Sequence, residues 1–168
     1  MDHQDTQIRH ATWEDWEDIL AIYDAGRQYM ASHGNPTQWG TSSPSEDEVR
    51  EDILRQRSFV YEVDHRAEGV FVLMAGEDPA YVQIEDGHWP NEAPYHVIHR
   101  IASAGRVKGV FHACISWCIE NCGTLRIDTH ADNRTMLHLI EKHGFQRCGI
   151  IHVADGTPRI AFQRDAVN

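Results

Sequence analysis

The stretch "HRIASAGRVKGVFHACISWC" (residues 99–118) decides the fold, because it joins a strand to a helix through a loop that contains two glycines. The first turn of a helix carries backbone N–H groups without partners inside the helix, and the helix dipole adds partial positive charge there. Gly105 and Gly109 relax this loop, and Arg106 and Lys108 add two cations. We therefore expect the loop to bind phosphate groups.

Two common phosphate-binding patterns are absent from the sequence. There is no G-x-x-x-x-G-K-[ST], which disfavours an NTPase, and no G-x-G-x-x-G after the first predicted strand, which disfavours a dinucleotide-binding fold. The pattern that remains is a short R-x-x-G loop late in the chain. Taken alone, that pattern is weak.

The bulk composition is typical of a single globular domain. The chain has 168 residues, of which 41% are apolar and 24% are charged, so we expect one domain over residues 1–168. A net charge of −11 with 15 Lys and Arg disfavours nucleic-acid binding. No apolar run approaches the ~20 residues of a membrane span. The first residues lack the apolar core of a secretory signal. We expect a cytoplasmic protein with no membrane partner.

The cysteines and histidines do not form a clear metal-binding pattern. Cys114, Cys118 and Cys122 follow one another at intervals of four in a predicted helix, where side chains on one helix rarely meet disulfide geometry. We interpret them as small buried residues. The twelve histidines are scattered and lack the helical spacing of zinc ligands. We predict no metal site, although a histidine and cysteine metal protein remains a rival interpretation.

The order of predicted elements indicates a mixed α/β sheet. Residues 7–11, 58–63, 69–76, 95–102, 124–130, 145–153 and 158–164 have strand patterns, and residues 13–30, 45–57, 109–121 and 133–144 have helix patterns. The segment "AYVQIEDG" (80–87) could be a further short strand or an irregular insertion. The pattern contains no internal repeat and no second domain.

A second motif supports the interpretation of the glycine loop as a phosphate-binding loop. In "RIDTHADNRTMLHLIEKHGF" (residues 126–145), Asn133 follows a strand and Gly144-Phe145 end a helix. Together the two motifs resemble the GNAT superfamily of acetyl-coenzyme A-dependent N-acetyltransferases. Its typical pattern is an apolar residue, four variable positions and [QR]-x-x-G-x-[GA]. Ile101, Arg106, Gly109 and position 111 occupy those places.

The resemblance implies a fold and a donor substrate. The fold would be an α/β, mostly antiparallel twisted sheet of about six or seven strands flanked by about four helices, with two central strands splayed apart. Acetyl-CoA would be the cosubstrate, its pyrophosphate on the loop and its pantetheine arm in the gap between the splayed strands. The residues implied for its binding are Ile101, Arg106, Val107, Lys108, Gly109, Val110, Phe111, Asn133, Met136 and Ile140.

Two positions depart from the family pattern. Position 111 is Phe where the family usually has Gly or Ala, so we expect its ring to turn into the core. Ile140 stands where many members keep a tyrosine that protonates the leaving thiolate. Because isoleucine cannot donate a proton, another group, water or positioning must serve instead.

The resemblance also implies an acceptor site. The main-chain N–H near Ile101 is the family's usual oxyanion donor, and either His99 or His96 could accept a proton, because these two side chains project to opposite faces of one strand. The residues expected around an amine acceptor are Tyr29, Trp39, Glu85, Asp86 and Trp89.

The resulting hypothesis is direct acetyl transfer to a primary amine of a small molecule or a peptide, in a ternary complex. The alternatives are transfer of a longer acyl group and a coenzyme A-binding or sensing module without catalysis. A homodimer is possible.

Overall fold

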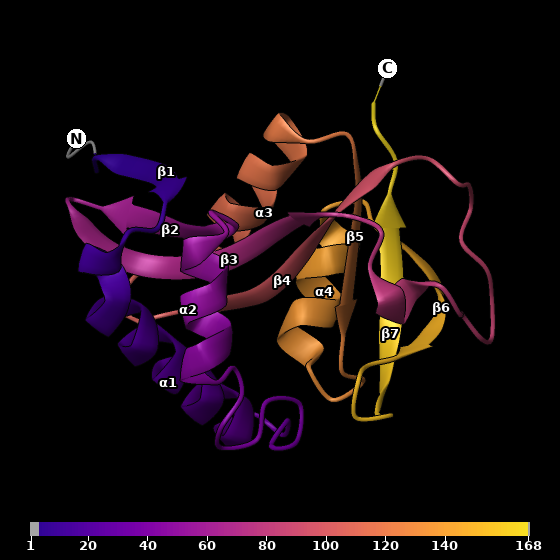
Figure 1. The fold of residues 1–168 in the computed structure, drawn as a ribbon, viewed down its shortest axis with the longest axis horizontal. Coiled ribbons are helices and arrows are strands. Elements are labelled where there is room, and N and C mark those ends of the chain that lie inside the picture. Colours follow the sequence, from indigo (N-terminus) through magenta and orange to yellow (C-terminus); the bar gives the residue numbers. More distant parts are fainter. Residues whose placement is uncertain (1–3, 168) are drawn as a thin grey trace.

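Seven strands form one sheet in the computed structural model, which describes residues 4–167 (Figure 1). The strand order is β1-β2-β3-β4-β5-β7-β6, and every neighbouring pair is antiparallel except β4–β5, which is parallel. The strands are β1 (Thr6–His10), β2 (Ser58–Val63), β3 (Arg66–Ala75), β4 (Tyr95–Ser103), β5 (Thr124–Thr129), β6 (Gln146–His152) and β7 (Pro158–Arg164). The helices are α1 (Trp16–Ser32), α2 (Glu46–Leu54), α3 (Val110–Asn121) and α4 (Arg134–Lys142), with short 3₁₀ turns η1 (Trp13–Asp15) and η2 (Pro79–Tyr81). The predicted fold class is confirmed.

Local signals in the sequence start these helices where they are observed. The Ser45 hydroxyl accepts a hydrogen bond from the Glu48 N–H, which caps α2, and the Asn133 side chain accepts one from the Met136 N–H, which caps α4. Gly109 precedes α3 with φ of 79°, a left-handed conformation that favours glycine. These caps set where the loop before each helix ends.

The helices cover opposite faces of the sheet. Val70 and Ala102 belong to the core cluster that also contains Ile19 and Ile22 of α1. Phe71 and Ile101 instead belong to the largest cluster, which contains residues of α3 and α4. Because successive strand residues point to opposite faces, α1 packs on one face and α3 on the other. The segment 80–87 is an irregular insertion, tied to β6 through an isolated bridge between Glu85 and Ile150.

Strands β4 and β5 pair only over their first residues. Tyr95–Val97 lie opposite Thr124–Arg126, and no further pairing between the two strands follows. Figure 1 shows the two strands beginning side by side and diverging toward their carboxyl ends. The predicted splay is therefore present. None of the described helices combines the length and apolarity that a bilayer span requires.

A bulge in β4 lies at the point of divergence. Val70 pairs with Ala102 and Val72 with His99, so that two residues of β4, Arg100 and Ile101, stand opposite one residue of β3. Arg100 has φ of 49°, and its carbonyl accepts a hydrogen bond of 2.9 Å from the Tyr23 hydroxyl of α1. This bond fixes the bulge to the helix beneath it.

The first prediction concerns that bond. We expect Tyr23→Phe to lower the free energy of unfolding by about 1–3 kcal/mol, because the carbonyl of Arg100 would lose its buried donor. Urea unfolding measures the loss. Tyr29→Phe is the matched control on the same helix, since its exposed hydroxyl bonds to Thr135 at the surface. Equal losses in the two variants would contradict the assigned role of Tyr23.

Candidate functional site

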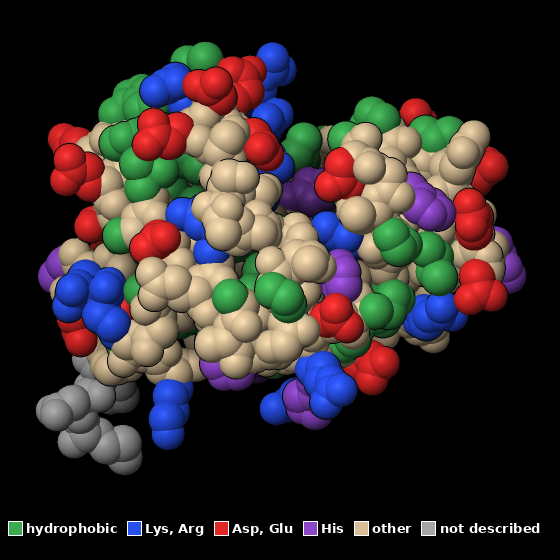
Figure 2. Space-filling model, turned by 90° about the horizontal axis from the view of Figure 1, so that it is seen from below, with side chains coloured by type: hydrophobic (Ala, Val, Ile, Leu, Met, Phe, Trp, Pro, Cys, Tyr) green, Lys and Arg blue, Asp and Glu red, His purple; other side chains and the backbone are tan. Residues whose placement is uncertain are grey.

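A cavity of about 780 Å³ lies where β4 and β5 diverge. Seen from below, the molecule is hollowed between its two halves, and atoms of histidine and of basic side chains are visible at the hollow (Figure 2). Most lining residues come from β4, β5, the α1–α2 loop, the start of α4, the segment after β3 and the turn between β6 and β7, and single residues come from α1, α2, β3, β6 and β7. The residues that the chemistry concerns are Gln38, Trp39, Asp78, Ile98, His99, Arg100, Ile101, Ile127, Asp128, Asn133, Met136, Asp155 and Arg159.

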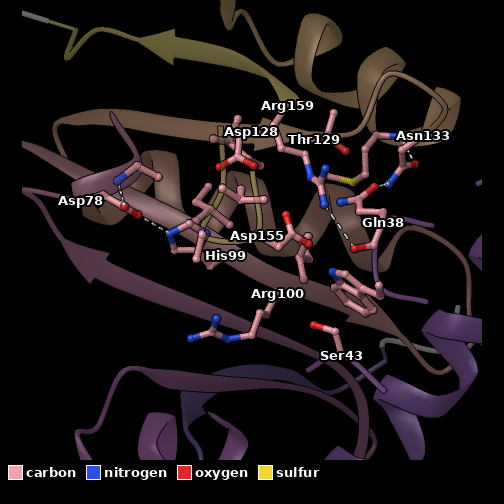
Figure 3. Close-up of a pocket in the computed structure, with 18 of the residues that line it drawn as sticks. Gln38, Ser43, Asp78, His99, Arg100, Asp128, Thr129, Asn133, Asp155 and Arg159 are labelled. Atoms are coloured by element: carbon pink, nitrogen blue, oxygen red, sulfur yellow. Dashed lines mark hydrogen bonds and ion pairs between the residues drawn. The ribbon is translucent and has the colours of Figure 1, made fainter. Parts of the chain in front are cut away.

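His99 and Asp78 form a hydrogen-bonded pair in this cavity (Figure 3). The Nε2 atom of His99 lies 2.8 Å from Oδ2 of Asp78, and this hydrogen bond lowers the pKa of the Asp78 carboxyl below its ordinary value. An ionised Asp78 accepts the Nε2 proton, which leaves Nδ1 of a neutral His99 ring as a proton acceptor. His96 is not among the cavity-lining residues, because it lies where β4 pairs with both β3 and β5.

Asp128 is a second carboxylate in the cavity, and the sequence analysis missed it. The Tyr81 hydroxyl donates to Oδ2 of Asp128 at 2.6 Å, and burial raises the pKa of this carboxyl. Its signal in the sequence was a single acidic residue near the end of the buried strand "TLRIDT". That signal does not reveal Tyr81 or Asp78, which come from a different part of the chain.

The α1–α2 loop closes one side of the cavity. The side-chain oxygen of Gln38 accepts hydrogen bonds from the Asn35 and Asn133 amides, which ties this loop to the start of α4. Trp39 packs edge-on against Tyr23 with ring centroids 5.6 Å apart. Of the predicted acceptor-site residues, the structure thus brings Trp39 into the cavity.

The loop before α3 has the features that anion binding requires. Gly105 and Gly109 have φ of 82° and 79°, and a Cβ added to either would meet no atom within 4 Å. Within residues 4–167, no backbone carbonyl or side chain accepts a hydrogen bond from the N–H groups of residues 106–109. The Val107 and Phe111 side chains pack against the largest core cluster, and Val110 is buried in it. The Phe111 ring therefore turns away from the loop, as expected.

The side chains of the two loop cations differ in their surroundings. Nε of Arg106 donates to Glu68 at 3.2 Å, and a terminal nitrogen donates to the Ala67 carbonyl at 3.0 Å. The expected placement of this guanidinium beside a phosphate is corrected, because Glu68 holds it against β3. Lys108 is exposed.

Several predicted residues lie outside the cavity. Glu85 pairs with Ile150 of β6, Asp86 forms an ion pair with Arg147, and Trp89 packs on Tyr81. These placements correct the expectation that the segment around residues 85–90 walls the acceptor site: Glu85 and Asp86 contact β6 instead.

The positions of Tyr29 and Ile140 correct two more expectations. Tyr29 is exposed and bonded to Thr135, outside the cavity lining. Ile140 is fully buried in the core, so it does not line the apolar side of the cavity, whereas Met136 and Ile101 do.

The cysteines have no chemical role that the structure supports. Cys114 and Cys118 are buried free thiols whose pKa values burial raises. In the part of the chain that the structure describes, no three His, Cys, Asp or Glu side chains group as metal ligands would.

The comparisons with known proteins agree with the geometry. A GNAT-family acetyltransferase from Streptococcus agalactiae has 28% sequence identity and a TM-score of 0.89, with 97% of this chain and 96% of that chain covered. An N-acetyltransferase from Staphylococcus aureus shares 21% identity at a TM-score of 0.62, covering 96% and 98% of the two chains. A ribosomal-protein-alanine N-acetyltransferase from Brucella melitensis also shares 21% identity at 0.62, covering 95% and 99%. No family model and no curated protein matches the sequence.

The splayed β4–β5 pair, the β4 bulge and the glycine loop before α3 define the fold class, and these comparisons agree with it. The fold is that of the GNAT acetyltransferases, and these similarities support assignment of the chain to the GNAT superfamily.

The second prediction uses the raised pKa of Asp128. A carboxyl whose pKa is higher in the folded than in the unfolded state stabilises the fold most at low pH, and this contribution is lost as pH rises through the folded pKa. Asp128→Asn keeps an acceptor for the Tyr81 hydroxyl without this titration. We expect the variant to gain stability relative to the wild type between pH 4.0 and pH 7.5. The expected gain depends on how far the pKa of Asp128 in the folded state lies above its pKa in the unfolded state. Each pKa unit of that difference corresponds to about 1.4 kcal/mol.

Urea unfolding at the two pH values measures that gain. Asp47→Asn is the control, since its side chain is 93% exposed on α2 and should show no comparable change. A gain for Asp128→Asn that shrinks as pH rises would contradict the assignment.

Proposed function

We propose that this chain is an acyl-CoA-dependent N-acyltransferase that moves an acetyl group from acetyl-CoA directly to a primary amine in a ternary complex. The observation that carries the proposal is the cavity opened by the β4–β5 divergence, next to a loop whose amides at residues 106–109 have no partner among the described residues. The cosubstrate supplies an acyl carbon joined to sulfur, so that amide formation releases a free thiol.

The donor side fits such a cosubstrate. Unpartnered N–H groups and the amino end of α3 attract a diphosphate, and no Cβ at Gly109 hinders its approach. The unpaired part of β4 leaves main-chain groups free to hold an extended arm as a surrogate strand. Ile101 and Met136 give this gap apolar walls.

The closed end of the gap supports a short acyl group. Val97 and Arg126 are the last paired residues of β4 and β5, and the next residues, Ile98 and Ile127, are both buried and both line the cavity. Two bulky side chains directly beside the closed end leave room for acetyl more readily than for a long chain. This supports acetyl over a longer acyl group.

His99 is the proposed proton acceptor. Asp78 holds its ring by the Nε2 proton, so Nδ1 is free to take a proton from the attacking amine, directly or through water. The Ile101 main chain lies in the bulge beside it and is the proposed oxyanion donor. Asp78 acts through His99 and is a positioning residue.

A catalytically inactive coenzyme A-binding module is the second candidate. It is favoured by Ile140, which takes the place of the family's tyrosine and is buried in the core. Free-thiol release with a panel of amines separates the two candidates: a binding module would bind coenzyme A and release no thiol above background.

The third prediction tests the phosphate loop. We expect Gly109→Trp to weaken acetyl-CoA binding by at least about tenfold, because the indole would cover the amino end of α3. Isothermal calorimetry measures the affinity. Gly34→Trp is the control, since Gly34 has φ of 81° and similarly open surroundings but lies in the α1–α2 loop. Unchanged affinity in folded Gly109→Trp would remove the loop assignment.

The fourth prediction tests the base. We expect His99→Gln to lower kcat by about 10²-fold or more, because Gln can bond to Asp78 but cannot accept the amine proton. His96→Gln, on the same strand outside the cavity, should retain activity within about twofold of the wild type. A greater loss in His96→Gln than in His99→Gln would show that the histidines were assigned in the wrong order.

A further inference from the structure

Arg159, at the start of β7, is a buried cation that lines the cavity without an acidic partner. The residue is 7% exposed, and its guanidinium donates to the backbone carbonyls of Pro158 at 3.0 Å and Gln38 at 3.2 Å. No carboxylate oxygen of residues 4–167 lies within 4.0 Å of it. These two bonds use two of its five N–H groups. In Figure 3 its side chain extends from the strand toward Gln38 at the cavity.

The other cations near the cavity are compensated within the protein. Arg100 also lines the cavity, but it donates to both carboxylate oxygens of Asp52, at 2.8 and 2.9 Å. Arg126 is buried and has aromatic compensation, because its guanidinium lies 3.8 Å from the Trp89 ring centroid and 4.0 Å from that of Tyr95. Arg159 has neither kind of partner in direct contact; Asp128 and Asp155 line the same cavity and feel its charge at longer range, so its remaining N–H groups are open to an anionic ligand.

The sheet register places Arg159 on the same face as the proposed chemistry. Asp128 of β5 pairs with Ala161 of β7, and Arg159 stands two residues before Ala161. Arg159 and Asp128 are therefore diagonal neighbours on one face, roughly 7–8 Å apart by ordinary sheet geometry. An acceptor in this cavity would meet a proton-accepting end at His99 and Asp128 and a cationic end at Arg159.

We propose that the acceptor is an amino acid: a small molecule with a carboxylate beside its primary amine, the carboxylate bound by Arg159. This inference rests on the proposed N-acyltransferase function. The guanidinium fork matches a planar carboxylate. Asp128 and Asp155 in the same cavity would repel a dianionic phosphate about twice as strongly as a monoanionic carboxylate, and a polyamine would place a second cation against Arg159. An unmodified peptide amino terminus has an amide where this site expects a carboxylate.

Matched substrate pairs test the proposal. Each of a panel of L-amino acids is compared with its own carboxamide, and kcat/KM is measured by thiol release from acetyl-CoA. We expect the wild type to prefer the acid over the amide by at least about tenfold for the accepted amino acid, because the amide cannot pair with the guanidinium. In Arg159→Gln, which can still donate to the Gln38 carbonyl, the ratio should fall to about one.

The ratio within one variant is insensitive to a general loss of activity, so a merely structural role of Arg159 would not move it. Arg147→Gln is the control, because this arginine is paired with Asp86 outside the cavity and should leave the ratio unchanged. Thiol release with amines but no preference for acids in the wild type would overturn this inference and leave the proposed function standing.

If no thiol is released, isothermal calorimetry measures the binding of each amino acid and its carboxamide instead. Amino-acid binding that exceeds amide binding and is lost in Arg159→Gln, with no thiol release, would support the carboxylate site and remove the proposed function. If no amino acid binds and no thiol is released across the panel, both the carboxylate site and the proposed function are overturned.

Discussion

The loss of hydrogen bonding between β4 and β5 beyond Val97 is the constraint on which the site depends. Parallel strands that start in register would continue to pair unless one of them left the ladder. The bulge at Arg100 changes the course of β4, and α1 holds the bulge through Tyr23 while α2 holds the Arg100 guanidinium through Asp52. The cavity is therefore maintained by helices that pack on the face opposite to α3.

The divergence also places two different sets of side chains on the two faces of the sheet. The face under α3 and α4 has apolar walls and a loop with free N–H groups, which suit an extended phosphate-bearing donor. The other face has His99, Asp128 and Arg159, which suit a small polar acceptor. In the proposed ternary complex, a donor and an acceptor on opposite faces would meet only where the strands separate, so the positions of the strands would largely determine the reacting geometry.

Charge is distributed unevenly within this acidic molecule. Partly buried arginines are paired with carboxylates, as Arg9 is with Asp15 and Glu62 and Arg100 is with Asp52, and these pairs fix elements that lie far apart in sequence. The two buried arginines lack such a pair: Arg126 lies against two aromatic rings, whereas Arg159 has no carboxylate oxygen within 4.0 Å among residues 4–167. A chain with net charge −11 has many carboxylates that could have filled this position. In the proposed complex, the carboxylate of the amino-acid acceptor takes that position.

The sequence by itself determined the features that depend on neighbouring residues: the strand–loop–helix unit with Gly109, the Asn133 cap of α4 and the order of elements. Its local patterns could not distinguish His99 from His96, because strand pairing and the bulge decide which one faces the cavity. Asp78 and Arg159 stand in segments without a motif of their own, and the segment around residues 85–90, expected to wall the acceptor site, pairs with β6 instead. Only the tertiary structure decided these, because contacts between residues tens of positions apart arise from packing of the whole sheet and leave no periodic signal in the chain.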